Sequence, residues 1–436
     1  MIPIDKSIID NHLQKNGIEN IGNSSIRQIV KVVKDIEAET GISFIKMEMG
    51  VPGLAPPQIG VQAEIAALQN GVASIYPMID GIPALKNEIA KFAKLFLNID
   101  ISPEGCVPTV GSMQGGFASF ITSCQRDKQK NKLLFIDPGF PVQKQQMNIL
   151  GLEYSSFDVY KYRGHKLRDK LEEFCKDGTI SSILYSNPNN PSWICLTDEE
   201  LQIIAEVAAK YDIIVIEDLA YFGMDFRADY STPGKAPYQP SIAHYYDNYI
   251  LLVSASKIFS YAGQRISALL VSNGLYNRNF PDLAERFSFP QFGKSLIYGA
   301  LYALSAGTSH SAQHALLALL QAANKGTYNF IQDVRTYGLR AQKMKKLFTD
   351  SGFSIVYDTD VDKPIADGFY FTISHTGYSG SELLYELLHY GISAITLDIT
   401  GSERTEGLRA CTSQIHESQI PDLEKRLQIF AQNNTH

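Results

Sequence analysis

The segment YILLVSASKIFSYAGQRISALLVS, residues 249–272, decides the fold, because it places a lysine between two apolar runs. The runs YILLVSAS and RISALLVS are short and rich in branched residues, which is typical of buried strands. Lys257 ends the first run, between two serines and Arg265. An amine held there loses hydration, which lowers its pKa and makes it a nucleophile or a base. A structural salt bridge is the alternative for a single lysine.

Other predicted strands precede this segment and are separated by helical stretches. They are KLLFID (132–137), SSILYS (181–186) and DIIVIED (212–218). Helical spacing of apolar residues lies between them, as in TDEELQIIAEVAAKY (197–211). Apolar strands that alternate with helices predict an α/β fold, with a mostly parallel sheet covered on both faces. Ligands gather at the carboxyl ends of such strands.

The pattern changes near residue 325. A long helical stretch is followed by short strands and another helix, which predicts a small α+β domain. We expect a large domain over residues 61–325, a small C-terminal domain over residues 326–436, and an N-terminal segment, residues 1–60, that joins the small domain.

Composition excludes several classes of protein. The net charge of −7 over 436 residues argues against a general nucleic-acid binder. The sequence contains no run of eighteen apolar residues, so it predicts no membrane span. The first residues do not resemble a signal peptide. The five cysteines lack CxxC spacing and the histidines form no HExxH pattern, so we expect free thiols in the cytoplasm and no metal site.

Four motifs beyond the predicted strands carry candidate site residues. TVGSMQGG (109–116) opens a helix whose first N–H groups can hold a phosphate, although a tight turn explains it equally. Phe140 can stack on a planar ring or belong to the core. SNPNNPSW (186–193) is a rigid loop with amide donors, or an ordinary Asn-Pro turn. EDLAY (217–221) ends a strand with a carboxylate that needs a partner, and a neighbouring arginine is the alternative to a ligand.

Taken together, these motifs fit one ligand, pyridoxal 5′-phosphate. Hydroxyl donors and the planar fork of Arg265 suit a phosphate. Lys257 suits an aldehyde, Asp218 suits a protonated ring nitrogen, and Phe140 suits a ring face. Each motif has a mundane explanation alone, but their occurrence in this order favours the cofactor.

The chain resembles the class I/II aminotransferases of the fold type I pyridoxal-phosphate enzymes from about residue 25 to residue 430. SASKIFSYAGQR matches the family pattern S-x-S-K…G-x-R, NPNNPSW is similar to N-P-x-N-P-T-G, and EDLAY matches D-x-x-Y. The resemblance implies a seven-stranded, mostly parallel sheet. It also implies an enzyme that moves an amino group between an L-amino acid and a 2-oxo acid through a Schiff base on Lys257.

The resemblance also implies roles for matching residues. Asp218 would pair with the pyridinium nitrogen, while Tyr221 and Asn190 would hydrogen-bond the phenolic oxygen of the cofactor. Phe140 would stack on its ring. The backbone at Ser112, Met113 and Gln114 would hold the phosphate, together with Ser254, Ser256 and Arg265.

Three looser matches concern the substrate and a homodimer. Arg409 in GLRACTS would bind the substrate α-carboxylate, with a surface or interdomain ion pair as the alternative. Tyr76 would reach the cofactor phosphate of the other subunit, unless it is only a buried interface residue. Gly50 in EMGVP would let the substrate approach.

The sequence also departs from the family pattern. Ser192 and Trp193 replace the usual Thr-Gly, a change that should alter the loop and can narrow the site entrance. Gln143 stands where the family often has tyrosine. Dicarboxylate-specific members use a second arginine, but no motif selects Arg278 or Arg286 for that role.

Two other functions compete with transamination. A C–S β-lyase or a related synthase uses the same residues, so the motifs leave that choice open. Some transcription regulators contain an aminotransferase-like sensor domain after a winged helix. Only about 25 residues precede the first family-like helix here, so we expect an enzyme that acts on small molecules, with no nucleic acid or membrane partner.

Overall fold

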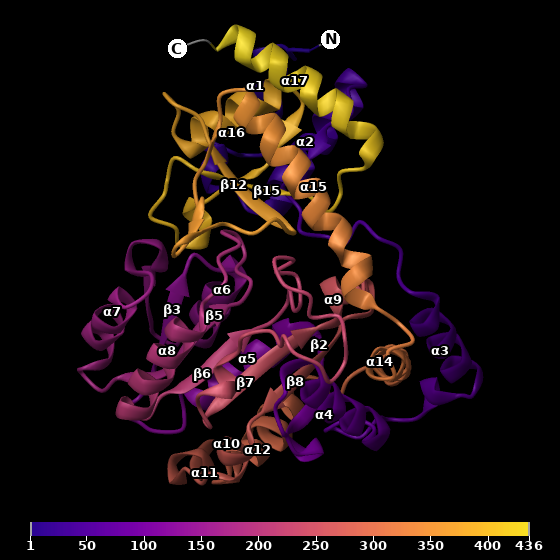
Figure 1. Cartoon of the computed structure of the whole chain (residues 1–436), viewed down its shortest axis with the longest axis vertical. Coiled ribbons are helices and arrows are strands. Elements are labelled where there is room, and N and C mark those ends of the chain that lie inside the picture. The colour runs from indigo at the N-terminus through magenta and orange to yellow at the C-terminus, as the bar shows by residue number, and fades with distance from the viewer. Residues whose placement is uncertain (1, 435–436) are drawn as a thin grey trace.

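A seven-stranded sheet forms the centre of the larger of two groups of elements in the computed structural model, which describes residues 2–434 (Figure 1). The strand order is β2-β8-β7-β6-β5-β3-β4; β8 runs antiparallel to β2 and β7, and the other neighbouring strands are parallel. The predicted α/β class is therefore confirmed. The strands are β2 (Cys106–Val110), β3 (Lys132–Asp137), β4 (Tyr154–Asp158), β5 (Ile180–Ser186), β6 (Ile214–Asp218), β7 (Tyr249–Ser254) and β8 (Ile266–Val271).

Both faces of this sheet are buried, because alternate residues along a strand enter different hydrophobic clusters. On β6, Ile214 and Ile216 belong to one cluster and Val215 to the other. The first face is covered by α5 (Gly111–Ser123), α6 (Pro141–Leu150), α10 (Asn273–Asn277), α11 (Pro281–Phe287), α12 (Phe292–Lys294) and the π-helix Ser295–Leu301, which α13 (Tyr302–Ser305) continues. The second is covered by α4 (Pro83–Leu97), α7 (Lys166–Cys175), α8 (Asp198–Tyr211) and α14 (His310–Asn324), with α3 (Gln58–Gln69) packed on α14.

Capping residues set the ends of several helices. Helix α2 (Ile26–Thr40) begins with a capping box between Ser25 and Gln28, and it ends at Gly41, whose φ is 68°. Thr197 and Glu200 form the same box at the start of α8. Helix α8 therefore occupies the stretch 197–211 that the sequence indicates as helical.

A second group of elements combines the two ends of the chain. The four-stranded sheet β14-β15-β12-β9 consists of β9 (Ser354–Ile355), β12 (Tyr370–Ser374), β14 (Ile395–Thr396) and β15 (Leu408–Cys411). Strand β1 (Ile45–Lys46) pairs in parallel with β13 (Ile392–Ser393). Helices α1 (Lys6–Lys15) and α2 share a hydrophobic cluster with α16 (Gly380–His389) and α17 (Ile420–Asn433). Helix α15 (Phe330–Asp350) runs from this group to the large sheet (Figure 1).

Within residues 2–434, no helix combines the length and the apolarity needed to cross a membrane.

Candidate active site

Neighbouring strands of the large sheet deliver their carboxyl ends to one cavity of about 290 Å³. Ser186, Asp218 and Ser254, which end β5, β6 and β7, all line it. The cavity also receives residues from the N-terminal segment and from the smaller sheet. The predicted residues in its walls are Gly50, Ser112, Met113, Phe140, Asn190, Asp218, Tyr221, Ser254, Ser256, Lys257, Arg265 and Arg409.

Lys257 lies on the short helix α9 (Ala255–Ile258), directly after β7. Its Nζ donates a hydrogen bond to the carbonyl oxygen of Gly50 and lies 5.4 Å from the centroid of the Phe369 ring. Burial lowers the pKa of Lys257 to about 8. The neutral amine, which a nucleophile requires, is therefore far easier to reach near physiological pH than it is for an exposed lysine.

Asp218 is a buried carboxylate whose partners are all uncharged. It accepts hydrogen bonds from Nε2 of Gln143 at 3.0 Å and from the backbone N–H of Ala220 at 3.1 Å. No lysine or arginine forms an ion pair with it within residues 2–434. Burial raises the pKa of Asp218 to about 6. A protonated ring nitrogen in the cavity would supply the missing positive charge.

The start of α5 and the α9 turn form a cradle for an anion. Gly111 has φ 65°, and a Cβ there would lie 2.4 Å from Nη2 of Arg265, so only glycine permits this close approach. The Ser112 hydroxyl is buried and has no hydrogen-bond partner among the described residues. Ser254 Oγ accepts from the backbone N–H of Ser256 at 3.1 Å. An unsatisfied donor beside a guanidinium fits a phosphate group.

Arg409 is 1% exposed, and its guanidinium group is held by uncharged acceptors. Nη1 donates to Oδ1 of Asn190 at 3.1 Å, and Nη2 donates to the carbonyl oxygen of Glu48 at 2.6 Å. No carboxylate pairs with it in the described part of the chain. Because its charge is not neutralised, Arg409 can bind a substrate carboxylate.

Tyr370 is a site residue that the sequence did not indicate. It lies on β12, lines the cavity, and its hydroxyl accepts a hydrogen bond from the Tyr221 hydroxyl at 2.8 Å. The apolar run GFYFTIS explains the omission, because a buried tyrosine in a strand usually belongs to the core.

Trp193 does not line the cavity. It is fully buried behind the two tyrosines, with ring centroids 5.3 Å from Tyr221 and 6.2 Å from Tyr370. Its φ of 65° is unusual for a bulky residue. A Cβ on Gly368 would lie 2.0 Å from the indole ring, so a glycine at this position makes room for the tryptophan. Trp193 therefore packs behind Tyr221 and Tyr370 and does not narrow the site entrance.

Four other candidate residues lie outside the cavity walls. The side chain of Gln114 bonds the backbone N–H of Val110 and the hydroxyl of Ser305. Tyr76 is 91% exposed. Arg278 forms an ion pair with Asp212 at 2.6 Å, and Arg286 lines a separate hollow.

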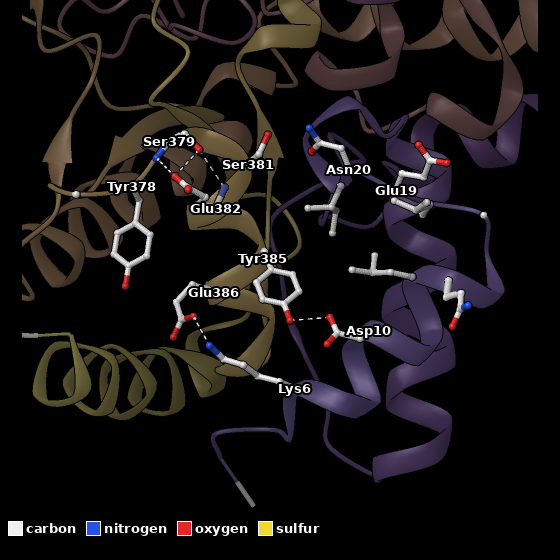
Figure 2. Close-up of a pocket in the computed structure, with 16 residues that line it drawn as sticks. Lys6, Asp10, Glu19, Asn20, Tyr378, Ser379, Ser381, Glu382, Tyr385 and Glu386 are labelled. Carbon is white, nitrogen blue, oxygen red and sulfur yellow. Dashed lines mark hydrogen bonds and ion pairs between the residues drawn. The ribbon is translucent and has the colours of Figure 1, made fainter.

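A separate groove of about 1170 Å³ lies between α1 and α16 and is lined by several carboxylates (Figure 2). Asp10 accepts a hydrogen bond from Tyr385, Glu386 pairs with Lys6 at 3.7 Å, and Glu382 caps α16. These are surface interactions without a buried nucleophile or base. We therefore place the chemistry in the smaller cavity around Lys257.

Comparison with known proteins agrees with this geometry. The family described as aminotransferase class I and II matches residues 43–427. The chain belongs to this family. Its members are generally dependent on pyridoxal 5′-phosphate, and the chain is an aminotransferase.

Curated relatives of the aminotransferase are only distantly similar. The probable aspartate aminotransferase of Methanocaldococcus jannaschii is 23% identical over 94% of this chain and 97% of its own length. Aromatic-amino-acid aminotransferase 2 of Thermococcus litoralis is 26% identical over 58% of this chain and 61% of its own length. Neither of these relatives is named a lyase.

Solved structures show the same fold. An aminotransferase from Mycobacterium tuberculosis superimposes with a TM-score of 0.76 at 17% identity, covering 94% of this chain and 96% of its own. An alanine aminotransferase from Pyrococcus furiosus has a TM-score of 0.75 at 18% identity, covering 96% of this chain and 99% of its own.

Proposed function

We propose that this aminotransferase binds pyridoxal 5′-phosphate and moves an amino group between an L-amino acid and a 2-oxo acid, with Lys257 as the reactive amine. One observation carries the proposal: Lys257 lines one cavity with the Asp218 carboxylate and the Arg409 guanidinium, neither of which has an ion-pair partner among the described residues. When bound, the cofactor supplies an aldehyde that captures amines and a ring that accepts electron density from Cα.

The residues around the cavity match the parts of this cofactor. Phe140 offers a ring face, and the amide nitrogen of Asn190 can donate to the phenolic oxygen because its carbonyl oxygen already holds Arg409. Asp218 would hold the proton on the ring nitrogen. The groups that would bind the phosphate are the backbone of residues 112–114 with Ser112, Ser254, Ser256 and Arg265.

The chain's own residues also suit the proton transfer at Cα. Arg409 would grip the substrate carboxylate with two parallel hydrogen bonds, which orients the Cα–H bond. Asn190 and the Glu48 carbonyl hold the guanidinium in place for this grip. Lys257, with its lowered pKa, would act as a general base that takes the proton from Cα. It would then return this proton to the aldehyde carbon of the cofactor.

We further propose a homodimer in which Tyr76 reaches the partner's cofactor phosphate. Ile75, Tyr76 and Met78 are exposed apolar residues, and so are Tyr302 and Leu304 nearby. A Cβ on Gly307 would lie 3.1 Å from Pro77, so the two exposed segments are neighbours. An exposed apolar surface of this kind is typical of an interface.

We also propose that residues 326–436 and the N-terminal residues 1–60 form a small domain beside a large domain over residues 61–325, and that the protein is cytoplasmic. The separate hydrophobic cluster shared by α1, α2, α16 and α17 supports a small domain that includes the N-terminal segment. All five cysteines are free and buried, which supports a reducing cytoplasm.

Reduction of the cofactor-loaded enzyme with borohydride, followed by peptide mapping, tests the central assignment. We expect the adduct on the peptide that contains Lys257, and an adduct on another lysine would refute the proposal. A half-reaction screen, in which amino acids bleach the cofactor absorbance, would then identify the substrate. Release of pyruvate and ammonia from cystathionine without an oxo acid would indicate the lyase instead.

A further inference from the structure

We propose that Tyr370 is a positioning residue that strengthens the hydrogen bond from Tyr221 to the cofactor and links it to the carboxylate-binding Arg409. The inference rests on the proposed function, because it assigns to Tyr221 a bond with the phenolic oxygen of the cofactor. Tyr370 would form a two-tyrosine relay with Tyr221.

The Tyr370 ring is held on several sides. The guanidinium carbon of Arg409 lies 4.5 Å from its centroid, and Trp193 packs edge-on against it. A Cβ on Gly50 would lie only 1.9 Å from the Tyr370 hydroxyl, so the backbone of the N-terminal segment closes over that oxygen. The hydroxyl therefore has little room to leave Tyr221.

The hydrogen bond between Tyr221 and Tyr370 must reverse its direction when Tyr221 donates to the cofactor. A tyrosine hydroxyl carries one proton, and Tyr221 donates it to Tyr370 in this structure. If Tyr221 donates to the cofactor instead, its oxygen becomes an acceptor for the Tyr370 proton. Hydrogen bonds arranged in such a chain polarise one another, which makes Tyr221 a stronger donor.

Arg409 connects this relay with the substrate. Burial raises the pKa of Tyr370 to about 12, and the cationic Arg409 opposes that rise. When a substrate carboxylate neutralises Arg409, the Tyr370 hydroxyl becomes a weaker donor. Binding of a substrate carboxylate to Arg409 thus weakens the hydrogen bond to the phenolic oxygen of the cofactor, through the buried side chains of Tyr370 and Tyr221.

The effect has a spectroscopic signature. A weaker donor leaves more negative charge on the phenolic oxygen, and that charge favours the proton on the nitrogen joined to Lys257. Tyr370→Phe should therefore raise the pH midpoint of the visible absorbance by roughly a few tenths of a unit, since cooperative strengthening is about 10–30% per bond. Tyr221→Phe, which removes the whole bond, should raise it further.

A double-mutant cycle tests the relay on the cofactor-loaded enzyme. Tyr370→Phe, Tyr221→Phe and the double variant are titrated beside wild type. Tyr249→Phe on β7 is the matched control, because Tyr249 is also buried but lies outside the cavity walls. Tyr370→Phe removes one oxygen atom and keeps the ring, and melting temperatures verify that each variant is folded.

We expect the midpoint to rise in Tyr370→Phe, to stay unchanged in Tyr249→Phe, and to show no further rise when Tyr370→Phe is added to Tyr221→Phe. A wild-type midpoint in Tyr370→Phe overturns the relay but leaves the proposed function intact. An equal shift in both backgrounds also overturns it, because Tyr370 would then act independently of Tyr221. If wild type forms no visible band with the cofactor, the proposed function fails and the relay fails with it.

Discussion

Replacing Lys257 with methionine should abolish transamination and, at the same time, stabilise the cofactor-free protein. Methionine has nearly the length of the lysine stem but no charge. The burial that activates the amine also penalises its protonated form, so folding is less favourable while the lysine is charged. Function and stability are thus expected to conflict at this residue.

The pKa of Lys257 sets the size of this effect. It falls from 10.5 to about 8 on folding. At about 1.36 kcal/mol per pKa unit, the cost at neutral pH is about 3 kcal/mol. Removal of the lysine also removes its hydrogen bond to Gly50 and its contact with the Phe369 ring, and this loss offsets part of the gain in stability. For 436 residues, at about 2.1 cal/mol/K per residue, a gain of roughly 2–3 kcal/mol raises the melting temperature by about 2–3 °C.

The stability difference between wild type and Lys257→Met should depend on pH. Because the pKa of Lys257 is lower in the folded state, the unfolded state binds more protons between about pH 8 and pH 10.5, and wild-type stability should rise with pH across that window. The methionine variant lacks this contribution. Its advantage should therefore shrink as the pH rises.

Thermal melts of the cofactor-free proteins at about pH 7 and about pH 9.5 measure this difference. Lys34→Met on α2 is the control, since Lys34 is exposed and should change stability little. A methionine variant that is less stable than wild type at neutral pH, or whose advantage does not depend on pH, would refute the reasoning.

Three further substitutions test other parts of the site. Asp218→Asn should retain the cofactor, as measured by its absorbance, but lower kcat by about 10²–10³-fold, because one preorganised charge is lost. Arg409→Lys should raise KM for the amino acid by about 10–100-fold in half-reaction kinetics, because lysine cannot form the paired hydrogen bonds. Gly368→Ala should destabilise the protein through contact with Trp193 and do so much less in a Trp193→Gly background, with a coupling of about 1–3 kcal/mol in urea denaturation. If the effects of Gly368→Ala and Trp193→Gly on the free energy of unfolding are additive, contact between these two residues does not cause the destabilisation.

Several features were predictable because they depend on neighbours in the chain. Thr197 caps α8 at the start of the stretch 197–211 that the sequence indicates, since caps satisfy backbone groups within one turn. The apolar runs became strands of the large sheet, since a strand buried on both faces needs apolar residues throughout. The half-polar edge strand β4 has no such run and was not predicted.

The sequence alone determined the alternation of strands and helices, and therefore which residues reach the carboxyl edge of the sheet. It also identified Lys257 as an unusual lysine, because its surroundings in the chain are apolar. Only the tertiary structure decided that Asn190 holds Arg409, that Tyr370 meets Tyr221 and that Trp193 fills the space above Gly368. These contacts join residues far apart in the chain, so their geometry exists only after the two ends of the chain have packed against the large sheet.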